Sequence, residues 1–111
     1  MLAEHAPDLV LVSAGYDAHG RDPLAAMELS SEGYAGMTSA LVRAVDDLGH
    51  GRLGFVLEGG YDLQALESSV AATVCAARGG SVPLAEGSIP SGAREAIDET
   101  LEALRSAGRR L

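Results

Sequence analysis

Two short apolar runs separated by an amphipathic segment constrain the fold more than any other feature of this chain. The first run covers residues 8–13 and the second covers residues 53–57, and both are rich in Leu and Val. Runs this short without polar alternation are typical of strands that are buried on both faces. Because a strand–helix–strand unit forms a parallel pair with a right-handed crossover, the sequence predicts an α/β fold with a parallel sheet.

The segment between the two runs predicts a helix. Ser30 or Ser31 can act as its N-cap, and the helix is expected to reach about Leu48. Gly49 and Gly51 then end it. Apolar residues at three- and four-residue spacing form its buried stripe: Tyr34, Met37, Leu41, Ala44, Val45 and Leu48.

A second helix is expected to begin after Asp62, which can act as its N-cap, and to extend to about Arg78. This helix is apolar on most sides, and polar residues that include Ser68 and Ser69 form a solvent-facing side only in its first half. We therefore expect the helix to be well buried. Residues 81–92 are typical of a linker, and residues 93–111 of a C-terminal amphipathic helix that runs to about position 109. The preceding residues, 1–80, form a βαβα unit.

Two parallel strands do not make a stable sheet by themselves, because both of its edges stay open. The second helix is also too apolar to lie on a two-stranded sheet that has one face in water. The chain is therefore predicted to be a piece of a larger α/β domain.

Composition excludes some classes of partner. The net charge is −8, from 8 Lys and Arg against 16 Asp and Glu. This charge argues against direct nucleic-acid binding, which needs clustered cations. No stretch approaches the roughly 18 apolar residues that span a bilayer, so no membrane partner is expected. The single cysteine, Cys75, excludes an internal disulfide and favours a reducing compartment, the cytoplasm. Cys75 lies in an apolar helical run and is expected to be buried.

Two segments that follow the strands carry the groups with chemical potential. Ligands of parallel sheets bind beyond the carboxyl ends of the strands, so residues 13–24 and 57–62 are expected to share one site. The first segment contains Asp17, His19 and Asp22. Asp22 precedes a proline, which favours an extended backbone that presents the carboxylate as a ligand for a divalent cation. The alternative is that Asp17 and Asp22 only form turns and that His19 is a surface residue.

The second segment places Tyr61 after Gly59 and Gly60. The glycines allow a positive φ and a close approach of the backbone to a ligand. A phenol stays protonated at neutral pH and can stabilise an oxyanion as a hydrogen-bond donor. The alternative is a tight turn in which Tyr61 packs and Asp62 caps the following helix.

The stretches Pro7–His19, Asp22-Pro23 and Leu57–Tyr61 resemble the C-terminal part of the zinc-dependent histone deacetylase family. That family also includes acetylpolyamine amidohydrolases and acetoin-utilisation proteins. The Leu-Glu-Gly-Gly-Tyr form is closer to its class II and bacterial branches. The resemblance implies a fragment of an arginase-like, three-layer α/β/α domain with a parallel sheet.

The resemblance also implies roles for individual residues. Asp22 would be a Zn²⁺ ligand, and Tyr61 would polarise the acetyl carbonyl. Gly59 and Gly60 would line the substrate channel, whereas His19 would not be a ligand. The substrate would be an acetylated lysine or polyamine.

The family's tandem histidines and its other zinc ligands lie upstream of the matching stretches, so the missing N-terminal part of the domain is an expected partner. The chain alone is expected to be inactive. Two further hypotheses stay open: a non-catalytic interaction module, and a small metal-binding protein that uses Asp17, His19 and Asp22.

Overall fold

The computed structural model describes residues 5–81 and 89–107. Their elements follow in the order β1 (Val10–Ala14), α2 (Ser31–Asp47), β2 (Leu53–Leu57), α3 (Leu63–Ala77) and α4 (Ser91–Ser106). β1 and β2 pair in parallel, from Val10 opposite Leu53 to Ala14 opposite Leu57. The predicted parallel strand–helix–strand unit is therefore confirmed.

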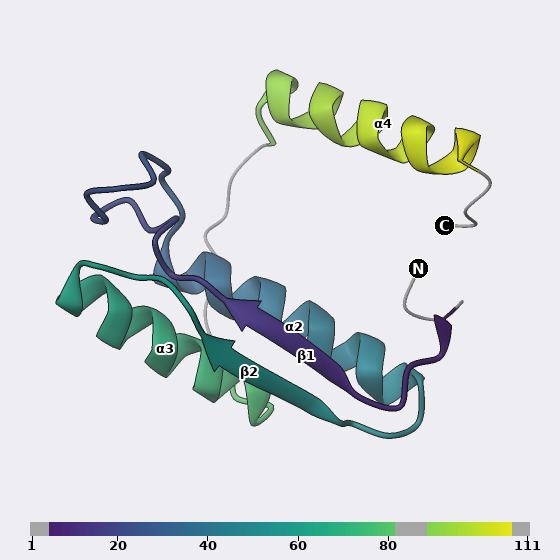
Figure 1. The fold of residues 1–111 in the computed structure, drawn as a ribbon, viewed down its shortest axis with the longest axis horizontal. Helices are drawn as coiled ribbons and strands as arrows, with labels where there is room; N and C mark the ends of the chain where they lie inside the picture. The colour runs from purple at the N-terminus through teal and green to yellow at the C-terminus, as the bar shows by residue number, and fades with distance from the viewer. Residues whose placement is uncertain (1–4, 82–88, 108–111) are drawn as a thin grey trace.

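Both helices that follow a strand lie on the same face of the sheet. In Figure 1 the two strands lie in front, with α2 and α3 side by side behind them. The core on this side contains Ala14, Tyr16 and Tyr34, with Val12 and Phe55 packed against them. The described residues thus form two layers of the α/β domain, a sheet and one helical layer.

Side chains cap the two helices as the sequence predicts. Ser30 Oγ accepts a hydrogen bond from the Gly33 N–H at the start of α2, at 3.2 Å. Asp62 Oδ1 accepts one from the Ala65 N–H at the start of α3, at 2.8 Å. Gly49 and Gly51 follow α2 with φ angles of +83° and +63°, values that favour glycine.

Small and polar residues form much of the interface between α2 and α3, which corrects two sequence predictions. The buried residues of α3 are Ala65, Ser69, Thr73 and Ala76, and Ser69 is 0% exposed. Leu63 and Val74 are exposed instead, and Cys75 is exposed as well. Helix α3 is therefore only partly buried. Its small residues are buried, Leu66 and Val70 pack partly buried against the core, and Leu63 and Val74 stay exposed.

Helix α2 buries two members of its predicted stripe, Tyr34 and Val45, together with two residues outside the stripe. Its buried residues are Tyr34, Ala35, Thr38 and Val45, whereas Met37 is exposed. The periodicity located the helix correctly, but the neighbouring small face of α3 decides which side is covered.

The outer face of the sheet is apolar and open within the described residues. Leu11 and Val56 are exposed, and Gly54 lies beneath Leu11, since a Cβ on Gly54 would lie 2.9 Å from Leu11 Cδ2. The strands are thus covered on the helical side only. Burial on both faces, which the apolar runs predict, would need more polypeptide than the structure describes.

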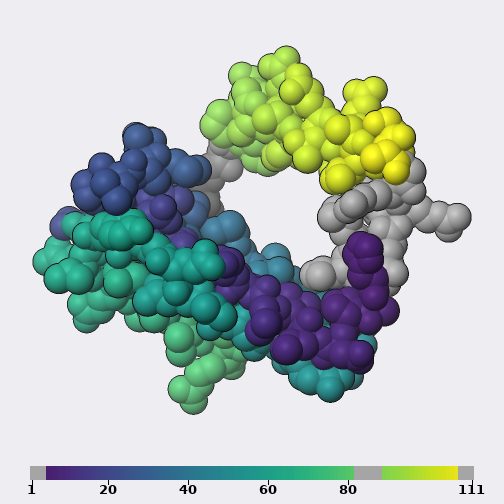
Figure 2. All heavy atoms as spheres, viewed as in Figure 1, coloured from purple at the N-terminus to yellow at the C-terminus, as the bar shows by residue number. Residues whose placement is uncertain are grey.

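Helix α4 begins two residues before the predicted Ala93, at Ser91, and ends at Ser106. None of its residues is buried. Figure 2 shows α4 set apart from the unit formed by the strands and the other two helices. Most of the predicted linker, residues 82–88, and the chain end, residues 108–111, lie outside the described residues. No described helix is long and apolar enough to cross a membrane.

The buried helical layer and the open outer face of the sheet predict different outcomes for one substitution, at Val45 of α2 and at Val56 of β2. Val45 is 1% exposed and Val56 is 55% exposed. In the 111-residue chain, Val45→Thr buries a hydroxyl and should lower the free energy of unfolding by about 1–3 kcal/mol. Val56→Thr should change it by no more than about 0.5 kcal/mol and should reduce aggregation. Urea denaturation and light scattering measure the two effects; an equal loss of stability would show that the outer face is covered.

Candidate functional site

The two candidate segments meet at the carboxyl ends of the strands. Backbone pairing continues past the strands, with the Glu58 N–H donating to Ala14 O at 3.1 Å and the Tyr16 N–H donating to Gly59 O at 2.8 Å. In Figure 1 the long loop after β1 and the short loop after β2 lie at the same end of the sheet. The prediction of one shared edge is confirmed.

Asp22 is the buried centre of this arrangement. It is 8% exposed. Its Oδ2 accepts a hydrogen bond from the Tyr61 N–H at 2.7 Å, and its Oδ1 accepts one from the Leu24 N–H at 2.9 Å. The structure thus brings two predicted site residues together, although they stand 39 positions apart.

These bonds keep the Asp22 carboxyl ionised. Burial raises its pKa, but the backbone N–H groups, first that of Tyr61 and then that of Leu24, outweigh burial and hold the pKa below its usual value. A carboxylate offers about four lone-pair positions, and two of them are occupied here. Asp22 therefore has the charge and the free lone pairs of a ligand for a hard cation.

Tyr61 is carried by a loop that admits only small residues at two positions. A Cβ on Gly59 would lie 2.9 Å from Asp17 Oδ1. Gly60 has a φ of +132°, and a Cβ there would lie 3.1 Å from the Cβ of Tyr16. Tyr61 itself is 59% exposed. The two glycines let the loop pass close to the first segment, while the phenol stays accessible.

His19 contacts Ser31 of α2, which in turn contacts two serines of α3. Its Nδ1 accepts a hydrogen bond from the Arg21 N–H at 3.1 Å, which places the ring proton on Nε2, 3.4 Å from Ser31 Oγ. Ser31 Oγ in turn lies 2.8 Å from Ser68 Oγ and 3.1 Å from Ser69 Oγ. His19 thus ties the loop to α2 and α3 and, with its acceptor nitrogen occupied, offers no lone pair to a metal.

No group of three His, Cys, Asp or Glu residues that could hold a metal ion occurs in residues 5–81 and 89–107. Asp17, His19 and Asp22 therefore do not form the metal centre that the small metal-binding hypothesis requires. Asp22 fits the role of one ligand in a larger set, and the described residues do not supply the others.

Arg21 makes long-range contacts that the sequence did not predict. Its Nε donates to Asp62 Oδ1 at 3.3 Å, and its Nη2 donates to Gln64 Oε1 at 2.8 Å. Arg21 thereby ties the Asp22 loop to the start of α3. No spacing rule reveals a pair separated by 41 positions, so only the folded chain shows it.

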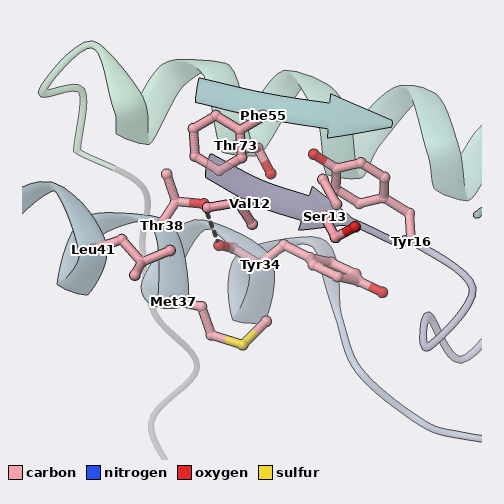
Figure 3. A pocket seen from close by; sticks show the side chains of 11 residues that line it. Val12, Ser13, Tyr16, Tyr34, Met37, Thr38, Leu41, Phe55 and Thr73 are labelled. Carbon is pink, nitrogen blue, oxygen red and sulfur yellow. Dashed lines mark hydrogen bonds between the residues drawn. The ribbon is translucent and has the colours of Figure 1, made fainter. Parts of the chain in front are cut away.

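A pocket of about 230 Å³ lies between β1 and α2, and residues 13–16 at the start of the first segment line it. Figure 3 shows Tyr34, Met37 and Leu41 on α2 facing Val12 on β1, with the Thr38 hydroxyl bonded to Tyr34 O at 2.8 Å. Neither Asp22 nor Tyr61 lines it. The pocket is largely apolar and lies where the sheet packs against the helical layer.

Comparisons with known proteins agree on one family. A family model described as the histone deacetylase domain matches residues 1–77. Histone deacetylase 14, chloroplastic, of Arabidopsis thaliana is 48% identical over 65 residues, which are 59% of this chain and 15% of that protein. Polyamine deacetylase HDAC10 of Homo sapiens is 38% identical over 104 residues, which are 94% of this chain and 15% of that protein.

A solved structure shares the fold. The histone deacetylase Clr3 superposes with a TM-score of 0.77 at 31% identity, over 88% of this chain and 16% of that chain. The chain thus spans about a sixth of each of these three proteins. Its open sheet face and its partly covered helices are those of a piece of the larger α/β domain.

Asp62 predicts a pH dependence of stability. Its pKa lies below the usual value, first because of the Ala65 N–H and then because of Arg21. The stabilisation by its ionised form is therefore complete above the usual carboxyl pKa of about 4 and is lost as the pH falls through the lowered value. Asp62→Asn keeps a capping oxygen without the charge. Urea midpoints of the parent chain should fall more steeply than those of Asp62→Asn between neutral and acid pH; parallel curves would contradict the assignment.

Proposed function

The chain belongs to the histone deacetylase family, and on that premise we propose that it supplies part of the active site of a zinc-dependent deacetylase. The observation that carries the proposal is the 2.7 Å bond between the Asp22 carboxylate and the Tyr61 N–H, which joins the two residues with matching roles in the family's motifs. The reaction proposed is hydrolysis of an acetyl amide, with acetyl-lysine or an acetylpolyamine as substrate. The names of the relatives, histone deacetylases and a polyamine deacetylase, support both substrate classes.

Asp22 is proposed as one zinc ligand. Its low pKa keeps it anionic, and its burial shields it from competing water. Zinc, when bound, supplies a Lewis acid for the carbonyl and lowers the pKa of the attacking water. The other ligands and the histidine base are proposed to come from the part of the domain outside the described residues. The 111-residue chain by itself is then inactive.

Tyr61 is proposed to donate its phenolic O–H to the carbonyl oxygen as negative charge develops there. A neutral phenol is suited to this task, because it donates a proton in a hydrogen bond without carrying charge of its own. Gly59 and Gly60 are proposed to line the channel for the acyl chain, since they immediately precede Tyr61 and carry no side chain.

A chimera tests the proposal. The matching segment of Histone deacetylase 14 is replaced by that of this chain, in which 48% of the aligned residues are already identical. The chimera should deacetylate an acetylated substrate. Tyr61→Phe should lower its kcat about 10²- to 10³-fold with little change in KM or zinc content. Asp22→Ala should lose zinc together with activity.

Tyr34→Phe is the matched control. The Tyr34 hydroxyl is buried without a hydrogen-bond partner among the described residues, so Tyr34→Phe also deletes one phenol oxygen, but from the core, where the ring packs against Tyr16. Activity should be unchanged. A folded, zinc-loaded chimera that is inactive, or one in which Tyr61→Phe keeps normal kcat, would favour the non-catalytic interaction module.

A further inference from the structure

The backbone around Tyr61 is fixed at both ends and, between them, by Asp22. On one side, Gly59 O accepts the Tyr16 N–H at 2.8 Å. On the other side, Asp62 caps α3 through the Ala65 N–H at 2.8 Å. Between these anchors lie Gly60 and Tyr61, and the Tyr61 N–H donates to Asp22 Oδ2.

Residues 60 and 61 need the hydrogen bond to Asp22, because glycine restricts the backbone conformation least. Gly60 has a φ of +132°, a conformation that other residues rarely adopt, and unfolded glycine has many alternatives to it. The Tyr61 ring is 59% exposed, so packing does little to hold it in place. A charge-assisted hydrogen bond to the backbone is the strongest restraint available to the residue.

The Asp22 carboxylate is itself well held. It is buried, and its second oxygen accepts the Leu24 N–H at 2.9 Å. The loop that carries it is closed at its base, where the Leu29 N–H donates to Ala18 O at 2.9 Å and the Gly20 N–H donates to Leu29 O at 3.0 Å. The carboxylate therefore has a defined position without any further ligand.

We propose that Asp22 is also a positioning residue for Tyr61, and that its carboxylate holds the Tyr61 backbone whether or not a metal is bound. Only the catalytic meaning of this role rests on the proposed function. A carboxylate that is both metal ligand and loop anchor sets the phenol relative to the metal through a single side chain.

Amide hydrogen exchange in the chimera tests this role without using activity. In metal-free protein, the Tyr61 amide, which donates to Asp22, should stay protected, within about threefold of the zinc-loaded form. Asp22→Ala in the same metal-free protein should speed its exchange about 10- to 100-fold, the effect of losing a hydrogen bond to a charged group. Asp22→Asn, which keeps one acceptor oxygen, should give an intermediate value.

Asp17→Asn is the matched control, because the Asp17 carboxylate touches the same loop at Gly59 without bonding to the Tyr61 N–H. It should leave exchange of the Tyr61 amide unchanged, and protection of α2 should be the same in every variant. If Asp22→Ala unfolds α2, the test rests on the wild-type chimera alone, by comparing its amide exchange with and without zinc. The proposal is overturned if chelation speeds exchange of the Tyr61 amide as much as Asp22→Ala does, or if Asp22→Ala leaves that amide protected. An inactive chimera with the expected exchange pattern would reject the proposed function and keep the positioning role.

Discussion

The buried carboxylate of Asp22 is the constraint on which the candidate site depends. Taking a charge out of water is costly unless hydrogen bonds replace the lost hydration. The N–H groups of Leu24 and Tyr61 provide that replacement from two different segments. The same two bonds lower the pKa of the carboxyl, bring the segments together and orient the lone pairs that remain free on its two oxygens. Charge state, loop geometry and ligand capacity thus have one physical cause.

Polar contacts around this centre join the loop to the helical layer. His19 lies between the Arg21 N–H and Ser31 Oγ, and Arg21 reaches Asp62 across the site. The buried Ser69 completes the cluster on α3. These contacts exist because α2 and α3 approach each other through small side chains. An interface of large apolar side chains would hold the helices further apart and leave the loop without its polar anchors.

The exposed apolar surfaces are consistent with the family to which the chain belongs. The outer sheet face, the exposed Leu63 and Val74 of α3 and the whole of α4 bury little against the described residues. In a three-layer α/β/α domain, further strands and a second helical layer cover such surfaces. The solved deacetylase that superposes on this chain is about six times as long, which gives room for those layers.

Local sequence determined the element types, the parallel pairing and the caps, because these follow from hydrophobic periodicity and from hydrogen bonds within a few residues. It also marked Asp22, Gly59, Gly60 and Tyr61 as chemically unusual, and the resemblance gave them roles. It could not show that α3 buries Ser69 and exposes Leu63, since a helix apolar on most sides does not reveal which face meets a neighbour. Nor could it show the Asp22–Tyr61 bond or the Arg21 contacts. These join residues about 40 positions apart, and only the folded sheet edge brings them within hydrogen-bonding distance.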